Sequence, residues 1–203
     1  MSWDFELSSS GNKQNFTVFP QGITRIRLVD NEPHIRWTHW INEQKRTVTC
    51  PGSHICPICE IRKQEKANKM QHKYNMSRRF TINVINRETG KLEIMEQGIT
   101  FFENLKDLKD ELDQEQNEKS LTDIDLKVRR KGEGMATTYR IDFDEEVPFS
   151  EADIKLMEEK VELSQYFKPH TPEVLVRVLN GESLDEIMKE LRESENEEAP
   201  VLK

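Results

Sequence analysis

The chain has 203 residues, of which 34% are hydrophobic and 33% are charged, and its formal net charge is −8. This length suits one domain, or one domain with an appended helical segment, and the polarity indicates a core of moderate size. The sequence has no run of 18 apolar residues, and its first residues lack the basic and apolar regions of a secretory signal. We therefore expect a soluble, cytoplasmic protein with no membrane partner.

The charge is divided unequally along the chain. Residues 1–95 hold 15 Lys and Arg against 9 Asp and Glu, a net charge of +6, whereas residues 96–203 hold 15 against 29, a net charge of −14. Such a division is typical of a basic binding region followed by an acidic tail. An acidic half can also be no more than a solvated helical surface.

Segments with alternating apolar and polar residues predict a series of short strands. They begin after a flexible N-terminal arm at residues 1–18. In residues 24–29 the alternation is clean, so we expect Ile26 to face inward and Arg25 and Arg27 to face outward. The other expected strands are residues 34–41, 46–50, 78–85, 91–95, 123–131 and 137–143.

Helices are expected at residues 60–74 and 100–112, and in a C-terminal helical segment at 149–192 that precedes an acidic tail at 193–203. Strands interrupted by one or two helices indicate a mainly β protein with inserted helices. The pattern fits an oligonucleotide-binding (OB) β-barrel. An SH3-like barrel or an α+β sandwich fits the same elements.

The three cysteines lie within ten residues of one another, in the stretch TVTCPGSHICPICEIRK. An odd, tightly clustered set is not typical of a disulfide framework. Cys56 and Cys59 form a C-x-x-C turn, a spacing that lets two thiolates bind one ion. Together with Cys50 they fill three of the four positions of a tetrahedral zinc site. We therefore predict one structural zinc ion.

Two histidines are candidates for the fourth ligand. His54 lies inside the cluster, but the single residue between it and Cys56 would force two ligands to approach from nearly opposite directions in a very short loop. His39 lies on a strand expected to pair with the strand that ends at Cys50, which places both side chains at the same end of adjacent strands. We favour His39 and keep His54 as the alternative.

Redox and catalytic readings of the cluster are less favoured. A thioredoxin-like C-x-x-C pair would be surrounded by a βαβ pattern, which the sequence lacks. A catalytic zinc would need an open coordination position and a nearby general base, and no H-x-E or H-E-x-x-H motif is present.

These features follow one another in a characteristic order: a His on a strand, a hairpin, a Cys, a short loop containing a His, and a C-P-x-C turn before a basic helix. This order resembles the zinc-containing single-stranded-DNA-binding proteins of large tailed bacteriophages. The likeness covers roughly residues 18–180. It is carried by Arg25-Ile26-Arg27, His39-Trp40-Ile41, Val48-Thr49-Cys50, His54, Cys56-Pro57-Ile58-Cys59-Glu60, LKVRRKGEGMATTYRIDF and Tyr166-Phe167-Lys168-Pro169.

The resemblance implies an OB-fold core at residues 19–148 with a zinc subdomain inserted at about 34–76. It also implies that the acidic C-terminal tail contacts phage replication proteins. The implied zinc ligands are His39, Cys50, Cys56 and Cys59.

Binding of single strands without sequence preference requires positive charge for phosphates and flat side chains for stacking. Among the aromatic residues, we do not expect Trp37 to stack on a base. We expect it to pack in the core, because it shares a strand face with Ile35 and Ile41. The expected nucleic-acid contacts are Arg36, Trp40, Lys45, Arg46, Tyr74, Arg78, Arg79, Lys127, Arg129, Arg130, Lys131 and Tyr139.

The leading hypothesis is a non-enzymatic protein that coats and protects single-stranded DNA in phage replication, recombination and repair, largely independently of sequence, in the cytoplasm of the infected bacterium. The alternative is a zinc-containing interaction adaptor of a replication or transcription complex. A zinc-dependent nuclease or deaminase would need a general base, for which the sequence offers no candidate.

Overall fold

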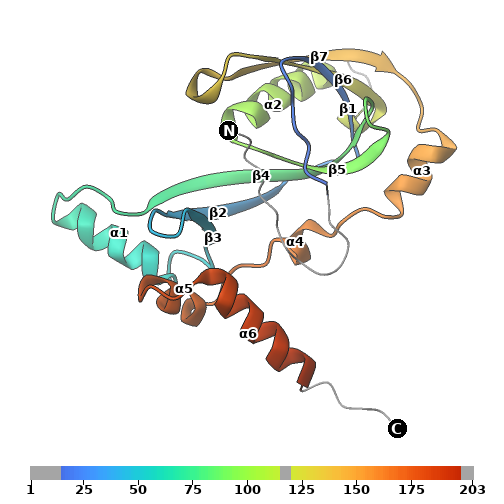
Figure 1. Ribbon diagram of the computed structural model, residues 1–203. Coiled ribbons are helices and arrows are strands. Elements are labelled where there is room, and N and C mark those ends of the chain that lie inside the picture. The colour runs from blue at the N-terminus through green and yellow to red at the C-terminus, as the bar shows by residue number, and fades with distance from the viewer. Residues whose placement is uncertain (1–14, 115–119, 198–203) are drawn as a thin grey trace, which may run out of the picture. The chain divides into compact units, whose positions relative to one another are not determined.

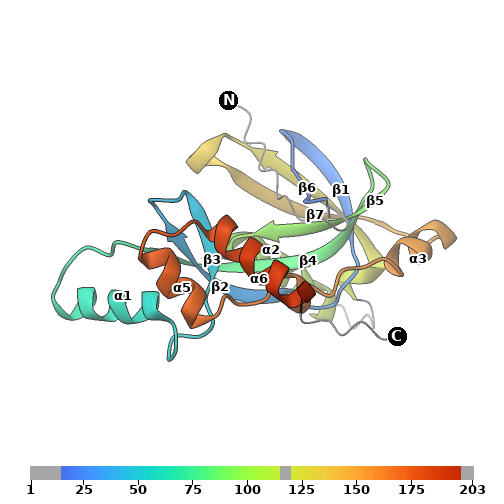
Figure 2. The same cartoon turned by 60° about the horizontal axis from the view of Figure 1, so that its bottom comes forward.

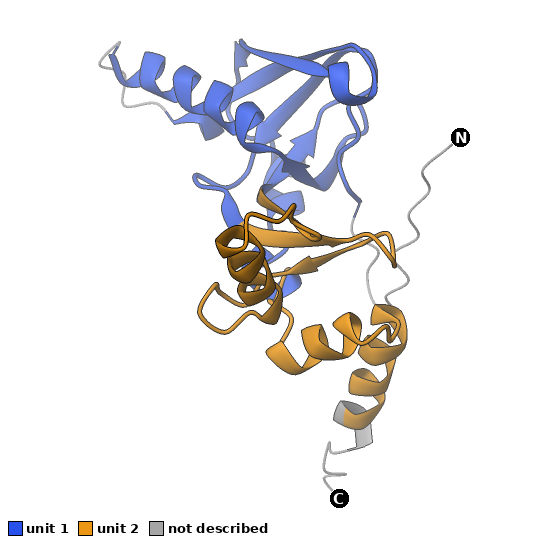
Figure 3. Cartoon of the chain, turned by 90° about the vertical axis from the view of Figure 1, so that its left-hand side faces the viewer, with its two compact units in different colours: residues 1–35, 79–166 blue, residues 36–78, 167–203 orange. Residues whose placement is uncertain are grey.

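The computed structural model describes residues 15–114 and 120–197. The chain divides into two compact units, coloured separately in Figure 3. Unit 1 comprises residues 1–35 and 79–166, and unit 2 comprises residues 36–78 and 167–203. Most of the expected N-terminal arm and the end of the expected acidic tail lie outside the described residues.

The described part of the chain is mainly β, with a seven-stranded antiparallel sheet and several helices (Figure 1). The strands are β1 (Gly22–Leu28), β2 (His34–Ile41), β3 (Arg46–Thr49), β4 (Asn75–Asn86), β5 (Lys91–Gln97), β6 (Ile124–Lys131) and β7 (Thr138–Glu146). The helices are α1 (Pro57–Ala67), α2 (Ile99–Gln114), α3 (Glu151–Met157), α4 (Leu163–Tyr166), α5 (Pro172–Leu179) and α6 (Leu184–Glu197), with 3₁₀ turns at Leu121–Asp123 and Gly134–Ala136. No helix among these is long and apolar enough to span a bilayer.

Unit 1 contains antiparallel strands in the order β5-β4-β1-β6-β7. Alternate residues of these strands face one core, because successive side chains in a strand point to opposite faces. Helix α2 packs against this core beside β7 (Figure 1). The core residues are Phe19, Ile26, Leu28, Phe80, Ile82, Val84, Met95, Phe101, Phe102, Leu105, Leu126, Val128 and Ile141.

Arg27 corrects one expectation about β1. It points away from the hydrophobic core as its alternation predicts, yet its side chain is 0% exposed. The guanidinium pairs with Asp125, donates to the carbonyls of Thr122 and Val147, and lies 4.9 Å from the centroid of the Phe149 ring. The segment after β7 therefore covers this end of the face, which strand alternation alone cannot predict.

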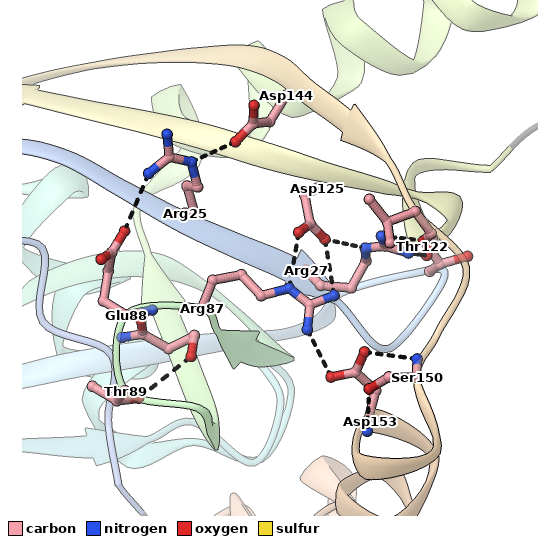
Figure 4. A network of polar contacts seen from close by, with 12 residues as sticks. Arg25, Arg27, Arg87, Glu88, Thr89, Thr122, Asp125, Asp144, Ser150 and Asp153 are labelled. Atoms are coloured by element: carbon pink, nitrogen blue, oxygen red, sulfur yellow. Dashed lines mark hydrogen bonds and ion pairs between the residues drawn. The ribbon is translucent and has the colours of Figure 1, made fainter.

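Arg87 extends this buried network toward α3 (Figure 4). It pairs with Asp125 at 2.9 Å and with Asp153 at 2.6 Å. Ser150 caps α3 by accepting a hydrogen bond from the amide of Asp153, whose carboxylate accepts one from the amide of Ser150. The network thereby attaches α3 to the strands of unit 1.

Unit 2 is built on the β2–β3 hairpin and three helices (Figure 2). Lys45 in the hairpin turn has a φ of +50°. Thr171 caps α5, with Pro172 at the first helical position, a combination that starts a helix efficiently. The core of this unit comprises Ile41, Val48, Cys56, Ile58, Tyr74, Val174, Leu175, Val178, Leu184 and Ile187.

Candidate metal centre and nucleic-acid interface

Four residues of unit 2 bring their ligand atoms together. His39 comes from β2, and Cys50 immediately follows β3. Cys56 is the N-cap of α1 and Cys59 lies in its first turn. A hairpin and a helix N-terminus therefore supply two ligands each, and all four ligand atoms lie within 4.8 Å of one another.

The distances suit a tetrahedral centre. The Cys50 and Cys59 sulfurs are 3.6 Å apart, and His39 Nε2 lies 3.4 Å from the sulfurs of both Cys56 and Cys59. A zinc ion with ordinary Zn–S and Zn–N bond lengths would separate its ligand atoms by roughly 3.5–3.8 Å. The four residues could therefore hold one metal ion, and a Cys₃His donor set is consistent with zinc.

The electrostatics of the cluster favour a bound cation. Burial lowers the pKa of His39 to about 4, aided by the nearby charge of Arg62, so its imidazole is neutral and able to bind a metal at neutral pH. Burial also raises the pKa of Cys50, and that of Cys59 to about 12. Since buried thiolates are costly without a compensating charge, a divalent cation is the partner that would let them ionise. The backbone amide of Gly52 already points at the Cys50 sulfur, 3.4 Å away.

His54, the alternative ligand, lies outside this group. Its side chain is exposed, and its ring lies beside Gly52 in the loop between the hairpin and α1. Four ligands are already present without it, so the cluster leaves no coordination position for His54. The arrangement therefore gives His54 no part in holding a metal.

In unit 1, the expected contacts on β6 and β7 divide between the two faces of the sheet. Lys127, Arg129 and Lys131 share the outer face, where Arg129 and Lys131 are exposed. Arg130 lies on the other face and donates to the carbonyl of Phe19 at 2.8 Å. The ring of Tyr139, which lies opposite Arg130, packs against those of Phe19 and Phe101. Tyr139 therefore serves the core instead of offering a stacking surface.

Acidic side chains neutralise part of the outer face. Asp144 pairs with both Arg25 and Lys127, and these cations hold the pKa of its carboxyl below the usual value although its desolvation acts in the opposite direction. Arg79 lies 3.9 Å from Glu96. Within the described ranges, Arg129 and Lys131 have no acidic partner, so they carry the uncompensated positive charge of this face.

The expected contacts in unit 2 also differ in accessibility. Lys45 is exposed in the hairpin turn, Arg46 pairs with Asp185 at 2.6 Å, and the Arg36 guanidinium lies 3.7 Å from the centroid of the Phe167 ring. The expected aromatic contacts offer less exposed surface on which a base could stack. Trp40 is half-buried.

Tyr74 is a correction, because only 4% of it is exposed and it belongs to the core of unit 2. Arg62 donates a hydrogen bond to its carbonyl, which ties the chain after α1 to the helix. Tyr74 therefore has no free ring face on which a base could stack.

Comparisons with known proteins give one informative relative. No family model and no solved structure matches the chain. A protein of Escherichia phage T5, named a probable ssDNA-binding protein, is 25% identical in an alignment of 158 residues, and the match covers 69% of this chain. The matched region covers 59% of the T5 protein, so the chain spans about three fifths of that relative's length. The relative's name says nothing of a metal.

Trp37 is the aromatic residue that the sequence placed wrongly. The residue is 46% exposed, whereas Ile41 on the same face of β2 is buried. The Arg78 guanidinium lies 6.0 Å from the centroid of the Trp37 ring. Strand periodicity assigns Trp37 to a face but does not reveal that the apolar cover of this face ends before Trp37. The adjacent arginine-rich stretch Ser77-Arg78-Arg79 is the one sequence signal that could have indicated an exposed partner.

Proposed function

We propose that this chain is a non-enzymatic protein that binds single-stranded DNA with little sequence preference. The observation that carries the proposal is the exposed, uncompensated pair Arg129 and Lys131 on the outer face of β6, in a chain with 25% identity to a phage protein named for binding such DNA. Cations aligned on one strand face suit the phosphates of a flexible single strand. The proposed biological role is to coat and protect such strands during phage replication, recombination and repair.

The strand order in unit 1 supports an OB-type barrel. An OB barrel has five strands in a Greek-key arrangement and binds oligonucleotides on strands 2 and 3 and on the loops that join strands 1–2 and 4–5. If β1, β4, β5, β6 and β7 are counted as its strands, α2 stands between the third and the fourth. The insertion between β1 and β4 then forms the first of these loops, and the β6–β7 turn forms the second.

One feature directs binding away from the outer side of β4. The Asn83 side chain there donates to Asp30 at 2.7 Å and to the carbonyl of Val161 at 3.0 Å. Asn83 and its neighbours on that side of the strand, Thr81 and Ile85, are buried. The loops and the outer face of β6 and β7 are therefore the proposed contact surfaces.

In this proposal the metal is zinc, bound by His39, Cys50, Cys56 and Cys59. A closed set of four protein ligands leaves no coordination position for water or substrate, which is the arrangement of structural zinc sites. The residues themselves fix the hairpin of unit 2 to the start of α1. The proposal gives the centre no catalytic part.

The acidic C-terminal tail is proposed to contact phage replication proteins in the infected bacterium, because the region after residue 95 carries most of the negative charge.

An adaptor without DNA affinity is the rival function. The ion pair of Arg46 with Asp185 favours it, because a cation already paired with an acid is a poorer phosphate ligand.

Fluorescence titration separates the two functions. The full chain is titrated with oligo-dT and with a duplex of the same length, at low salt and at about 0.15 M salt. The proposal predicts tighter binding of oligo-dT, with an affinity that falls as salt rises. Absent binding, or equal affinity for both forms, would refute single-strand recognition and favour the adaptor.

A further inference from the structure

We infer that Trp37 and Arg78 form a stacking site in unit 2 for an unpaired nucleobase and its adjoining phosphate. This inference rests on the proposed function and names a contact within it. An indole presents a flat surface to any base, and a neighbouring guanidinium can neutralise the phosphate that follows. Such a site would bind single strands without reading their sequence.

The exposure of Trp37 is the first observation. Trp37 as a residue is 46% exposed, although it lies on a strand whose next residues are buried. Met76, on β4, is 39% exposed and shares a strand face with Arg78. An exposed indole with a guanidinium 6.0 Å from its ring centroid can stack on a base while the cation contacts the adjoining phosphate.

The support of Trp37 is the second observation. The backbone amide of Cys50 donates to the carbonyl of Trp37 at 2.8 Å, and the hydroxyl of Thr38 donates to the carbonyl of Ser77 at 3.3 Å. The first bond joins Trp37 to β3, and the second joins its neighbour on β2 to the neighbour of Arg78 on β4. The ring is thus presented from a strand hydrogen-bonded on both sides, so little ordering is needed on binding.

The other aromatic residues proposed as contacts offer less surface, which is the third observation. Tyr74 is buried and Tyr139 packs against two phenylalanine rings. Trp40 is half-buried, and it lies on the opposite face of β2 from Trp37. Within unit 2, Trp37 is therefore the best available stacking surface.

Substitution of Trp37 tests the site. Trp37→Leu keeps apolar bulk but removes the stacking surface, whereas Trp37→Phe retains an aromatic face. For Trp37→Leu we expect oligo-dT to bind about 5- to 150-fold more weakly, the change that corresponds to ~1–3 kcal/mol for one stacked base, and for Trp37→Phe a smaller loss. The matched control is Val176→Ala on α5, since Val176 is 45% exposed in the same unit; it should bind as the wild type does.

A second measurement avoids any folding defect of these variants. The chain has three tryptophans, Trp3, Trp37 and Trp40, so the variant W3F/W40F keeps Trp37 as the only indole. Oligo-dT should quench its fluorescence and protect it from acrylamide. If Trp37→Leu binds like the wild type, or if bound oligo-dT leaves Trp37 accessible, the stacking site is refuted while single-strand binding stands. If the wild type itself binds no single strands, the proposed function fails as well.

Discussion

The backbone amide of Cys50 donates a 2.8 Å hydrogen bond to the carbonyl of Trp37. One residue of this pair belongs to the candidate metal centre, and the other carries the most exposed indole in the described part of the chain. His39 stands two residues beyond Trp37 on the same face of β2, so the centre and the indole share a single stretch of hairpin. Loss of a bound metal should therefore change how Trp37 is held at the surface of unit 2.

Metal removal is the first prediction. A chelator that strips zinc should weaken oligo-dT binding by about tenfold or more, because the hairpin that presents Trp37 loses the ion holding it to α1. Zinc release is followed with a colorimetric chelator, and acrylamide quenching of W3F/W40F reports on the indole. Restored zinc should restore both signals. If the metal-free chain keeps full affinity and unchanged quenching, the centre does not support the binding surface.

The choice of histidine ligand gives the second prediction. His39→Ala should weaken zinc binding by more than about 100-fold, beyond the 10- to 100-fold loss typical of removing a partner that only orients a ligand. His54→Ala should retain one zinc per chain, because His54 is exposed and outside the cluster. Zinc content after dialysis and thermal unfolding measure both effects. Retention of zinc by the His39 variant, or its loss from the His54 variant, would reverse the assignment.

The metal cluster was largely predictable from local sequence. The C-x-x-C spacing determines how two sulfurs approach one ion, and a hairpin brings a residue on its first strand beside the end of its second. Both constraints act over a few residues, so the sequence indicated the three cysteines and favoured His39 over His54 as the fourth member of the cluster. The mainly β character followed in the same way from strand periodicity.

The sequence did not predict which side chains would be buried by segments distant along the chain. Arg27 alternates as a surface residue, but a segment about 120 residues later supplies the carbonyl of Val147 that buries it. Tyr74 and Trp37 show the same effect in opposite directions, since helices far along the chain cover one and leave the other open. Periodicity assigns a side chain to a face, whereas its exposure depends on what later packs there.

The buried network of unit 1 gives the third prediction. Asp125→Asn removes the carboxylate that pairs with both Arg27 and Arg87, and leaves Arg27 fully buried without a counter-charge. Removal of one partner from a buried pair typically costs about 3–5 kcal/mol. Urea unfolding monitored by circular dichroism measures the loss. The control, Asp110→Asn, breaks an exposed pair with Lys106 and should cost less than about 0.5 kcal/mol. Equal effects of the two substitutions would show that the network contributes little.

The outer face of β6 gives the fourth prediction. Arg129→Ala combined with Lys131→Ala should lower affinity for oligo-dT and make the slope of log K against log salt less negative by about 1.4, since each phosphate contact on a single strand contributes about 0.7. Titrations at several salt concentrations supply the slope. The control removes Lys106 and Lys109 from α2, where both are paired with aspartates, and should leave the slope unchanged. An unchanged slope in the first variant would exclude this face as a phosphate contact.

The pH dependence of unit 2 gives the last prediction. Burial lowers the pKa of His170 below its usual value of about 6.5, and its Nδ1 accepts a 2.9 Å hydrogen bond from the amide of Thr49. Protonation at Nδ1 would replace that acceptor with a donor. The unfolded chain takes up the proton first as pH falls. The free energy of unfolding should therefore be undiminished above pH ~6.5 and decrease below it, by up to about 1.4 kcal/mol per pH unit until the folded pKa is reached.

His170→Asn keeps an acceptor but cannot titrate, so its free energy of unfolding in urea should decrease less between pH 6.5 and 5. Since acid also protonates metal ligands in both proteins, the difference between the two pH profiles isolates His170, and superimposable profiles would contradict its role.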